Sequence, residues 1–128
     1  MEDMKVLHSV HPDDFKSYDT EQIRSRFLLT DLKKEDEASL VYTHYDRMIV
    51  GLVYPVSKTV ALGNFANLRS AYFLERREIG IINVGGPGVI EADGQVHTVN
   101  KLDALYIGKG VKEVNFKSAD PASPAVFY

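Results

Sequence analysis

The sequence contains no cysteine, which excludes a disulfide scaffold, a thiolate nucleophile and any metal site with Cys ligands. No apolar run approaches the roughly 20 residues that a membrane-spanning helix needs. The opening segment MEDMKVLHSVHPDDF lacks the basic region and the apolar stretch of a secretory signal. Together these absences predict a soluble, cytoplasmic protein with no membrane partner.

The sequence also lacks a strong excess of charge of either sign. It has 15 Lys and Arg against 18 Asp and Glu, which gives a formal net charge of −3. A chain without a basic surplus has no electrostatic reason to bind nucleic acid or an anionic membrane, so neither is expected as a partner. The length and composition are those of one globular domain, since 128 residues with 45% hydrophobic content can bury a core.

One short helix is predicted near the N-terminus, directly after Asp19. Asp19 can cap it, and the side chain of Gln22, at the third helical position, can reach back to complete a capping box. From Ala38 onward the period changes to two, which is typical of β-strands. Strands are predicted over residues 38–45, 48–53, 58–62, 71–75, 79–84, 89–92, 95–99, 104–107 and 112–116.

Glycine-containing turns separate these strands. Asp93-Gly94 between two strand-like runs predicts a β-hairpin, because a type I′ turn needs positive φ at both central residues. Residues 85–88 and 108–110 are predicted as two further turns. Many short strands behind one short helix predict an all-β fold with a double sheet or a closed barrel.

The spacing of some residues resembles that of the cupins, whose fold is a double-stranded β-helix or jelly-roll barrel. Glu78 and Gly85 match the E-x6-G end of the first cupin motif, and Gly108-Lys109-Gly110 resembles the turn of the second. The histidines of both motifs are missing, and Glu113 stands in place of the last one. Because zinc needs three or four N, O or S donors, no metal site is predicted in this chain.

A closer resemblance is to the family of 5-keto-4-deoxyuronate isomerases, also called 4-deoxy-L-threo-5-hexosulose-uronate ketol-isomerases. The segments HSVHPDDFKSYDTEQIRSRFLL, YTHYDRMIVGLVYPVSKTVALG, YFLERREIGIINVGGPG, LDALYIGKGVKEVNF and PAVFY are similar to the N-terminal half of that family, in the same order. The resemblance implies that residues 1–128 form a single N-terminal cupin domain. It also implies that the C-terminal zinc-binding cupin of the family is absent from this chain.

The same resemblance implies a function for the complete enzymes. They convert 5-keto-4-deoxyuronate, a small uronate, to 3-deoxy-D-glycero-2,5-hexodiulosonate in the breakdown of pectin, with zinc in the C-terminal domain and a hexameric assembly. For this chain it implies a structural and oligomerisation domain that is inactive alone, forms a homo-oligomer and has no cofactor of its own. No catalytic residue and no zinc ligand of the family has a counterpart here.

The charged run Glu75-Arg76-Arg77-Glu78 leaves three interpretations open. It can be a strand end with cross-strand ion pairs, a pocket in which Arg76 or Arg77 clamps a substrate carboxylate, or an interface to a second domain or subunit. The interface is favoured. Glu78 and Glu113 are candidate bases of a pocket, although a base without an electrophilic partner rarely makes an enzyme.

Other residues that attract attention have simpler interpretations. The four histidines are expected in structural or surface roles. Lys109 lacks the spacing and the following helix of a phosphate-binding loop. Two function hypotheses remain: the structural half of a zinc-dependent isomerase, and a stand-alone, metal-free sugar-binding or sugar-isomerising cupin that uses Glu78, Glu113 and the neighbouring arginines. The missing motif histidines favour the first.

Overall fold

The computed structural model describes residues 1–128, and strands hold 34% of them against 12% in helices. The predicted all-β class is therefore confirmed. None of the helices combines the length and the apolar character needed to cross a membrane. In chain order the elements are β1 (Lys5–Leu7), α1 (Pro12–Phe15), α2 (Thr20–Phe27), β2 (Glu37–Thr43), β3 (Ile49–Tyr54), β4 (Val60–Ala61), the 3-10 helix η1 (Ala66–Leu68), β5 (Ile79–Ile82), β6 (Gly88–Ala92), β7 (Gln95–Val99), β8 (Ala104–Ile107) and β9 (Val114–Ser118).

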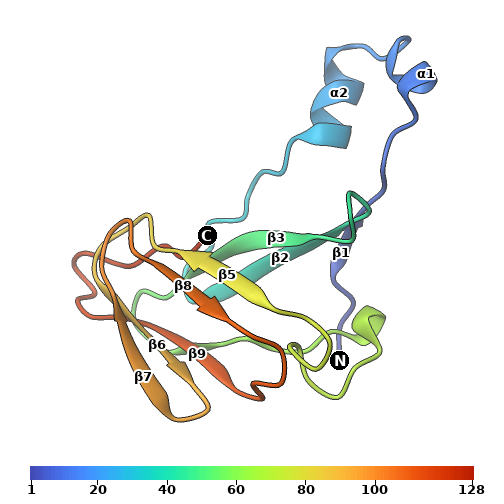
Figure 1. Ribbon diagram of the computed structural model, residues 1–128. Coiled ribbons are helices and arrows are strands. Elements are labelled where there is room, and N and C mark those ends of the chain that lie inside the picture. Colours follow the sequence, from blue (N-terminus) through green and yellow to red (C-terminus); the bar gives the residue numbers. More distant parts are fainter.

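The strands form three hydrogen-bonded groups (Figure 1). In the first, β1 runs parallel to β2, and β2 pairs with β3 as an antiparallel hairpin. The second has the order β4-β9-β6-β7, with Ile90 of β6 opposite Phe116 of β9. The third is the antiparallel pair of β5 and β8. The sheets do not close, so the cupin-type barrel expected from the motif spacing stays a prediction.

The last residues of the chain form a short strand between β3 and β5. The backbone amide of Phe127 donates to the carbonyl of Val53 at 2.9 Å, and the amide of Val53 donates back at 2.8 Å. Tyr128 exchanges two such bonds of 2.8 Å with Ile82 on the other side. These bonds merge the β1-β2-β3 group and the β5-β8 pair into one continuous sheet.

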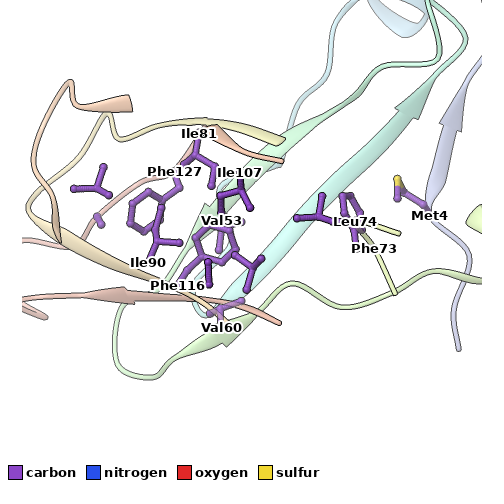
Figure 2. Close-up of a cluster of buried hydrophobic side chains, with 14 residues drawn as sticks. Met4, Val53, Val60, Phe73, Leu74, Ile81, Ile90, Ile107, Phe116 and Phe127 are labelled. Atoms are coloured by element: carbon purple, nitrogen blue, oxygen red, sulfur yellow. The ribbon is translucent and has the colours of Figure 1, made fainter. Parts of the chain in front are cut away.

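The hydrophobic core lies between this continuous sheet and the β4-β9-β6-β7 sheet (Figure 2). Phe116 and Phe127 come from opposite sides, are each 1% exposed, and have ring centroids 5.4 Å apart. Val53, Ile81 and Ile90 complete the centre of the cluster. Because burying one such side chain contributes about 1.5–3 kcal/mol, these few contacts supply much of the stability of a small domain.

One polar side chain, that of Asn83, is buried completely among these apolar groups. Its amide nitrogen donates to the carbonyls of Gly86 and Val99, both at 2.8 Å. Its amide oxygen accepts from the backbone amides of Gly85 at 3.0 Å and Val126 at 3.3 Å. A buried amide is tolerated only when its hydrogen bonds are made, and here every donor and at least two acceptor sites are used. Asn83 thus ties β5 to β7 and to the last strand.

Glycine allows the last segment to approach the loop before β6. A Cβ atom at Gly86 would collide with the carbonyl of Ser123, and one at Gly88 with the ring of Phe127. Neither glycine has positive φ. The sequence predicts a turn at residues 85–88, and the structure has a bend there, but the glycines are needed for close approach rather than for backbone handedness.

The Asp93-Gly94 hairpin and the capped helix are confirmed. Asp93 and Gly94 have φ of 46° and 81° and connect β6 to β7. In α2 the amide of Gln22 donates to Asp19 Oδ1 at 2.8 Å, and Gln22 Oε1 accepts from the amide of Asp19 at 2.9 Å. This is the predicted capping box, and α2 begins at Thr20, directly after the cap.

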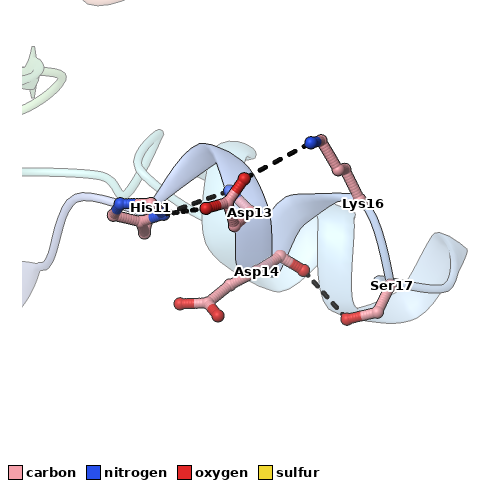
Figure 3. A network of polar contacts seen from close by, with 5 residues as sticks. All are labelled: His11, Asp13, Asp14, Lys16 and Ser17. Carbon is pink, nitrogen blue, oxygen red and sulfur yellow. Dashed lines mark hydrogen bonds and ion pairs between the residues drawn. The ribbon is translucent and has the colours of Figure 1, made fainter.

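A second, shorter helix, α1, is not predicted by the sequence pattern. His11 caps it, since Nδ1 accepts from the amide of Asp13 at 3.1 Å, and Lys16 contacts the Asp13 carboxylate at 3.3 Å (Figure 3). Neither α1 nor α2 contains a buried residue. Residues 8–34, which we call the N-terminal arm, project away from the sheets (Figure 1).

One predicted strand is absent, and one observed strand was not predicted. Residues 71–75 form turns instead of a strand, and both Phe73 and Leu74 are buried although they are neighbours. Alternation of side chains across a sheet cannot bury two consecutive residues on one face, so the segment folds as a loop. Conversely, β1 is missed, because three residues paired in parallel with β2 leave too short a pattern.

Asp36 organises the connection between β3 and β4. Its Oδ1 accepts from the backbone amides of Val56, Ser57 and Lys58 at 2.8 to 3.2 Å, and its Oδ2 accepts from the Ser57 hydroxyl at 2.6 Å. The Ser57 hydroxyl and the backbone donors lower the pKa of Asp36 from 3.8 to about 2. The ionised carboxylate is therefore the form that holds this loop.

Replacing Asn83 with Ala is expected to lower the free energy of unfolding by about 2–4 kcal/mol, because the buried carbonyl of Val99 and three part-buried backbone groups lose their partner. Urea denaturation of both proteins measures the difference. Asn100→Ala, at an exposed position whose side chain makes no hydrogen bond, is the matched control. A change for Asn83→Ala as small as that of the control would contradict the structural role.

Asp36→Asn is expected to lower thermal stability at neutral pH and to flatten its dependence on acid. The pKa of Asp36 is depressed in the folded state, so its contribution is complete above the ordinary value of 3.8 and is lost as the pH falls toward 2. Melting temperatures between pH 2 and 7 test this, with the exposed Asp3→Asn as control. Parallel curves for the wild type and Asp36→Asn would refute the assignment.

Candidate functional site

A cleft of about 650 Å³ opens beside the core, lined by the β2–β3 hairpin, by β5 and by the loop before β5. Its floor is apolar and includes Val53, Ile81, Phe116 and Phe127. Charged residues stand around this floor: Asp46, Arg47, Arg76, Arg77, Glu78 and Lys109. The cleft therefore combines a hydrophobic surface with a mostly cationic rim, a pattern typical of sites for small organic ligands.

The structure brings together three of the four residues that the sequence singles out as site candidates. Arg76, Arg77 and Glu78 all line the cleft. Glu113 does not. It is exposed beside the Asp93-Gly94 turn, where its backbone amide donates to Asp93 Oδ1 at 2.8 Å. Glu78 and Glu113 thus do not share one pocket, and a joint role for them has no support in the geometry.

Arg77 is held in place by two contacts. Its guanidinium lies over the ring of Tyr42, with Cζ 5.2 Å from the ring centroid, and Nη1 donates to the carbonyl of Arg47 at 3.2 Å. The turn at Asp46-Arg47 presents that carbonyl, because both residues adopt positive φ, as a tight hairpin requires. A stacked, half-buried guanidinium loses little further freedom when it binds a ligand.

Arg76 and Glu75 are used within the preceding loop. Nη2 of Arg76 donates to the carbonyl of Arg69 at 2.5 Å, and the Glu75 carboxylate accepts from the amide of Ala71 at 2.8 Å. The only ion pairs of the chain lie in the N-terminal arm, around Asp13. The interpretation of residues 75–78 as a strand end with cross-strand ion pairs is therefore wrong. The pocket interpretation agrees with the geometry, and the interface interpretation stays a prediction.

Glu78 is paired with a tyrosine. The hydroxyl of Tyr106, on β8, donates to Glu78 Oε2 at 2.6 Å. This hydrogen bond, with smaller contributions from desolvation and from the negative charge, raises the pKa of Tyr106 above its ordinary value of 10.0. The carboxylate of Glu78 is thus an acceptor for a neutral hydroxyl group at the edge of the cleft.

The sequence pattern does not identify Tyr42, Arg47 or Tyr106 as parts of the site. Tyr42 and Tyr106 read as ordinary strand residues, and their contacts to Arg77 and Glu78 join positions 35 and 28 residues apart, respectively. Arg47 carries a weak signal, because it lies in the two-residue gap between the strands predicted over residues 38–45 and 48–53. Lys109, dismissed as a phosphate-loop residue, lines the cleft from the turn after β8.

The residues of the cleft do not fit a zinc ion. Zinc needs three or four donors, and the carboxylates that line the cleft are those of Asp46 and Glu78 alone. No group of three or more His, Asp or Glu side chains lies close enough to hold a metal anywhere in the chain. His8 stacks on His44, with ring centroids 4.8 Å apart, and His11 caps α1, so these three histidines serve other contacts.

Comparison with known proteins identifies relatives of the chain. No model of a protein family matches it. The 4-deoxy-L-threo-5-hexosulose-uronate ketol-isomerase of Yersinia enterocolitica is 46% identical over 127 residues, which make up 98% of this chain and 46% of the relative. The enzymes of that name from Yersinia pestis and Yersinia pseudotuberculosis are 49% identical over the same shares. The chain is a homologue of these ketol-isomerases.

The resemblance to the ketol-isomerase family is thereby confirmed along almost the whole chain. The chain spans about half the length of the curated ketol-isomerases that it matches.

Glu78→Gln is expected to lower the pKa of Tyr106 relative to the wild type, because the hydrogen bond weakens and the negative charge disappears. The raised pKa means that this contact stabilises the fold below pH 10.0 and is lost as the pH rises through the folded-state value. Ultraviolet titration, with Tyr106→Phe to isolate this tyrosine among the seven, measures the shift. An identical titration in Glu78→Gln would argue against the pair.

Proposed function

We propose that this chain is the N-terminal, non-catalytic half of a 4-deoxy-L-threo-5-hexosulose-uronate ketol-isomerase, with a cupin-type fold. The observation that carries the proposal is the extent of the match, which covers 98% of this chain at 46–49% identity but only 46% of each relative. The chain's role is then structural, while the reaction on the uronate belongs to the complete enzyme. A cytoplasmic place in pectin breakdown completes the proposal and agrees with the absence of cysteine.

The chemistry of a ketol isomerisation supports this division of roles. A proton must move between adjacent carbons while the negative charge of an enediolate is stabilised. In the cleft, the carboxylate of Glu78 accepts the Tyr106 hydroxyl, and the donor set does not fit zinc. The zinc that the family resemblance implies is therefore assigned to the other half of the complete enzyme.

The N-terminal arm supports a role in oligomerisation. Phe15 and Phe27 pack edge to face at 5.7 Å, and Phe27 lies 6.5 Å from Tyr45 at the base of the arm. Phe15 and Phe27 nevertheless remain 45% and 47% exposed. Helices of four and eight residues are marginal in water without a packing partner. We assign this aromatic cluster to the contact with a second copy of the chain, because most soluble oligomers are symmetric assemblies of identical subunits.

The 128-residue chain is expected to show no turnover of 5-keto-4-deoxyuronate, whereas a complete relative measured in the same assay turns it over. Formation of the isomerised product, followed by NMR, is the measurement. Turnover by this chain that disappears in Glu78→Gln would contradict the proposal and support the metal-free enzyme. The variant Glu113→Gln is the control, since Glu113 lies outside the cleft.

The wild-type chain is expected to self-associate at micromolar concentration, and Phe15→Ser combined with Phe27→Ser to shift it to monomer, because the exposed aromatic area is removed. Light scattering after size-exclusion chromatography gives the masses. Val96→Ser, which removes an exposed apolar side chain from β7, is the matched control. A monomeric wild type, or a double variant that associates like the wild type, would refute the role of the arm.

A further inference from the structure

The strand of residues 126–128 fills only one end of the space between β3 and β5. Its pairing lasts to the final residue, because Tyr128 exchanges two backbone hydrogen bonds of 2.8 Å with Ile82. Beyond this pair, β3 and β5 continue back to their first residues, Ile49 and Ile79, with no strand between them. Figure 1 marks the C-terminus beside these two strands. The cleft lies in the remaining space, since residues of both strands line it.

The backbone groups that face this space have no partners. Successive residues of a paired strand direct their N–H and C=O groups to alternate sides. Val53 of β3 bonds to the last strand, so Gly51 and Ile49 face the same side, and the residues between them bond to β2. Ile82 of β5 also bonds to the last strand, so Gly80 faces the cleft as well. Gly51, Ile49 and Gly80 make no hydrogen bond on the cleft side.

The spacing of β3 and β5 suits one further stretch of strand. Neighbouring strands lie about 4.8 Å apart, so two strands with one strand between them are separated by about 10 Å. The observed pairs of the last strand continue with a period of two. The first residue beyond Tyr128 would therefore bond to Gly51. The second would bond to Gly80 and the third to Ile49, so that one strand satisfies both walls of the cleft.

The floor of the cleft suits the side chains of such a strand. Side chains alternate along a strand, and Phe127 points into the core while Tyr128 is exposed. The first and third residues beyond Tyr128 would thus point inward, onto the apolar floor that Val53, Ile81 and Phe116 form. A small ligand covers the same floor but leaves most of the backbone groups of the two walls without partners. An extended chain meets both requirements at once.

We propose that the cleft is a strand-acceptor site: in the complete ketol-isomerase, the segment that follows position 128 continues the last strand through it, antiparallel to β3 and β5. The first and third residues of this segment are apolar, and none of the first three is proline. The proposal rests on the proposed function, which makes this chain the N-terminal half of an enzyme about twice as long. With the strand in place the floor of the cleft is covered, in agreement with a half that does not catalyse.

Amide hydrogen exchange, followed by NMR, tests the site in this chain and in a chain extended after Tyr128 by Val-Thr-Val. The amides of Gly51 and Gly80 are expected to exchange rapidly in the 128-residue chain and at least about a hundredfold more slowly in the extended chain. The melting temperature is expected to rise by about 4 °C or more, since new hydrogen bonds form and two apolar side chains are buried. The extension Val-Pro-Val is the matched control, because proline lacks the N–H that faces Gly80.

The complete enzyme shows whether its own segment takes this place. In the ketol-isomerase of Yersinia enterocolitica, the amides aligned with Gly51 and Gly80 are expected to exchange as slowly as those aligned with the central strand β6. Deuterium uptake measured by mass spectrometry gives both rates. Proline in place of the second residue after the one aligned with Tyr128 is expected to speed exchange at the position aligned with Gly80.

Three results would overturn the proposal. The first is rapid exchange at Gly51 and Gly80 in the extended chain, or protection by Val-Pro-Val equal to that by Val-Thr-Val. The second is rapid exchange at the aligned positions of the complete enzyme. The third is equal protection of the 128-residue chain by the free peptide acetyl-Val-Thr-Val-amide, which would make the cleft a site for a separate partner. Because protection is measured without activity, the strand can be confirmed even if the turnover assay contradicts the proposed function.

Discussion

The strand formed by residues 126–128 between β3 and β5 is the constraint on which the rest of the structure depends. Without it, the β1-β2-β3 group and the β5-β8 pair share no backbone hydrogen bonds through which they could form one sheet. Phe127 supplies both parts of the connection, since its backbone pairs with Val53 and its ring packs against Phe116 across the core. Asn83 adds a buried amide that bonds to Val126 and to β7. One short segment thus unites the backbone pairing and the core.

The cleft depends on the same strand. Phe127 and Tyr128 line it, together with Val53 and Ile81 from the two strands that they join. The β2–β3 hairpin carries Asp46 and Arg47 on one side of the cleft, and the loop before β5 carries Arg76 and Arg77 on the other. The distance between the two sets of charges is therefore set by the strand between β3 and β5.

Features that arise from neighbouring residues could be predicted from the sequence. The Asp93-Gly94 hairpin and the Asp19–Gln22 capping box depend on two to four consecutive residues, and both are present. The all-β class follows from the repeated alternation, which also places most strands within two or three residues of their observed ends. The wrong strand at residues 71–75 shows the limit of this reasoning, because the short apolar run from Tyr72 to Leu74 is compatible with a strand and with a packed loop. Tertiary packing buries both Phe73 and Leu74 in a loop.

Features that join distant residues could not be predicted. In the sequence, Asn83 looks like a polar residue that ends a strand. Its structural role depends on hydrogen bonds to Val99 and Val126, which lie 16 and 43 residues away. The site shows the same pattern: the charges at residues 76–78 are conspicuous in the sequence, but the stacking of Arg77 on Tyr42 and the bond from Tyr106 to Glu78 depend on the fold. Glu113 is the reverse case. The motif spacing makes it a candidate site residue, but the fold places it outside the cleft.

Native-state hydrogen exchange tests the central role of the last strand most directly. If residues 126–128 unite the sheet, the amides of Phe127 and Tyr128 exchange only when the whole domain unfolds, with the same opening free energy as the amides of β6 and β9. Chain ends that are not held in this way fray and exchange at nearly zero opening free energy. Rapid exchange at Phe127 and Tyr128, in a protein whose β6 and β9 amides stay protected, would contradict the account.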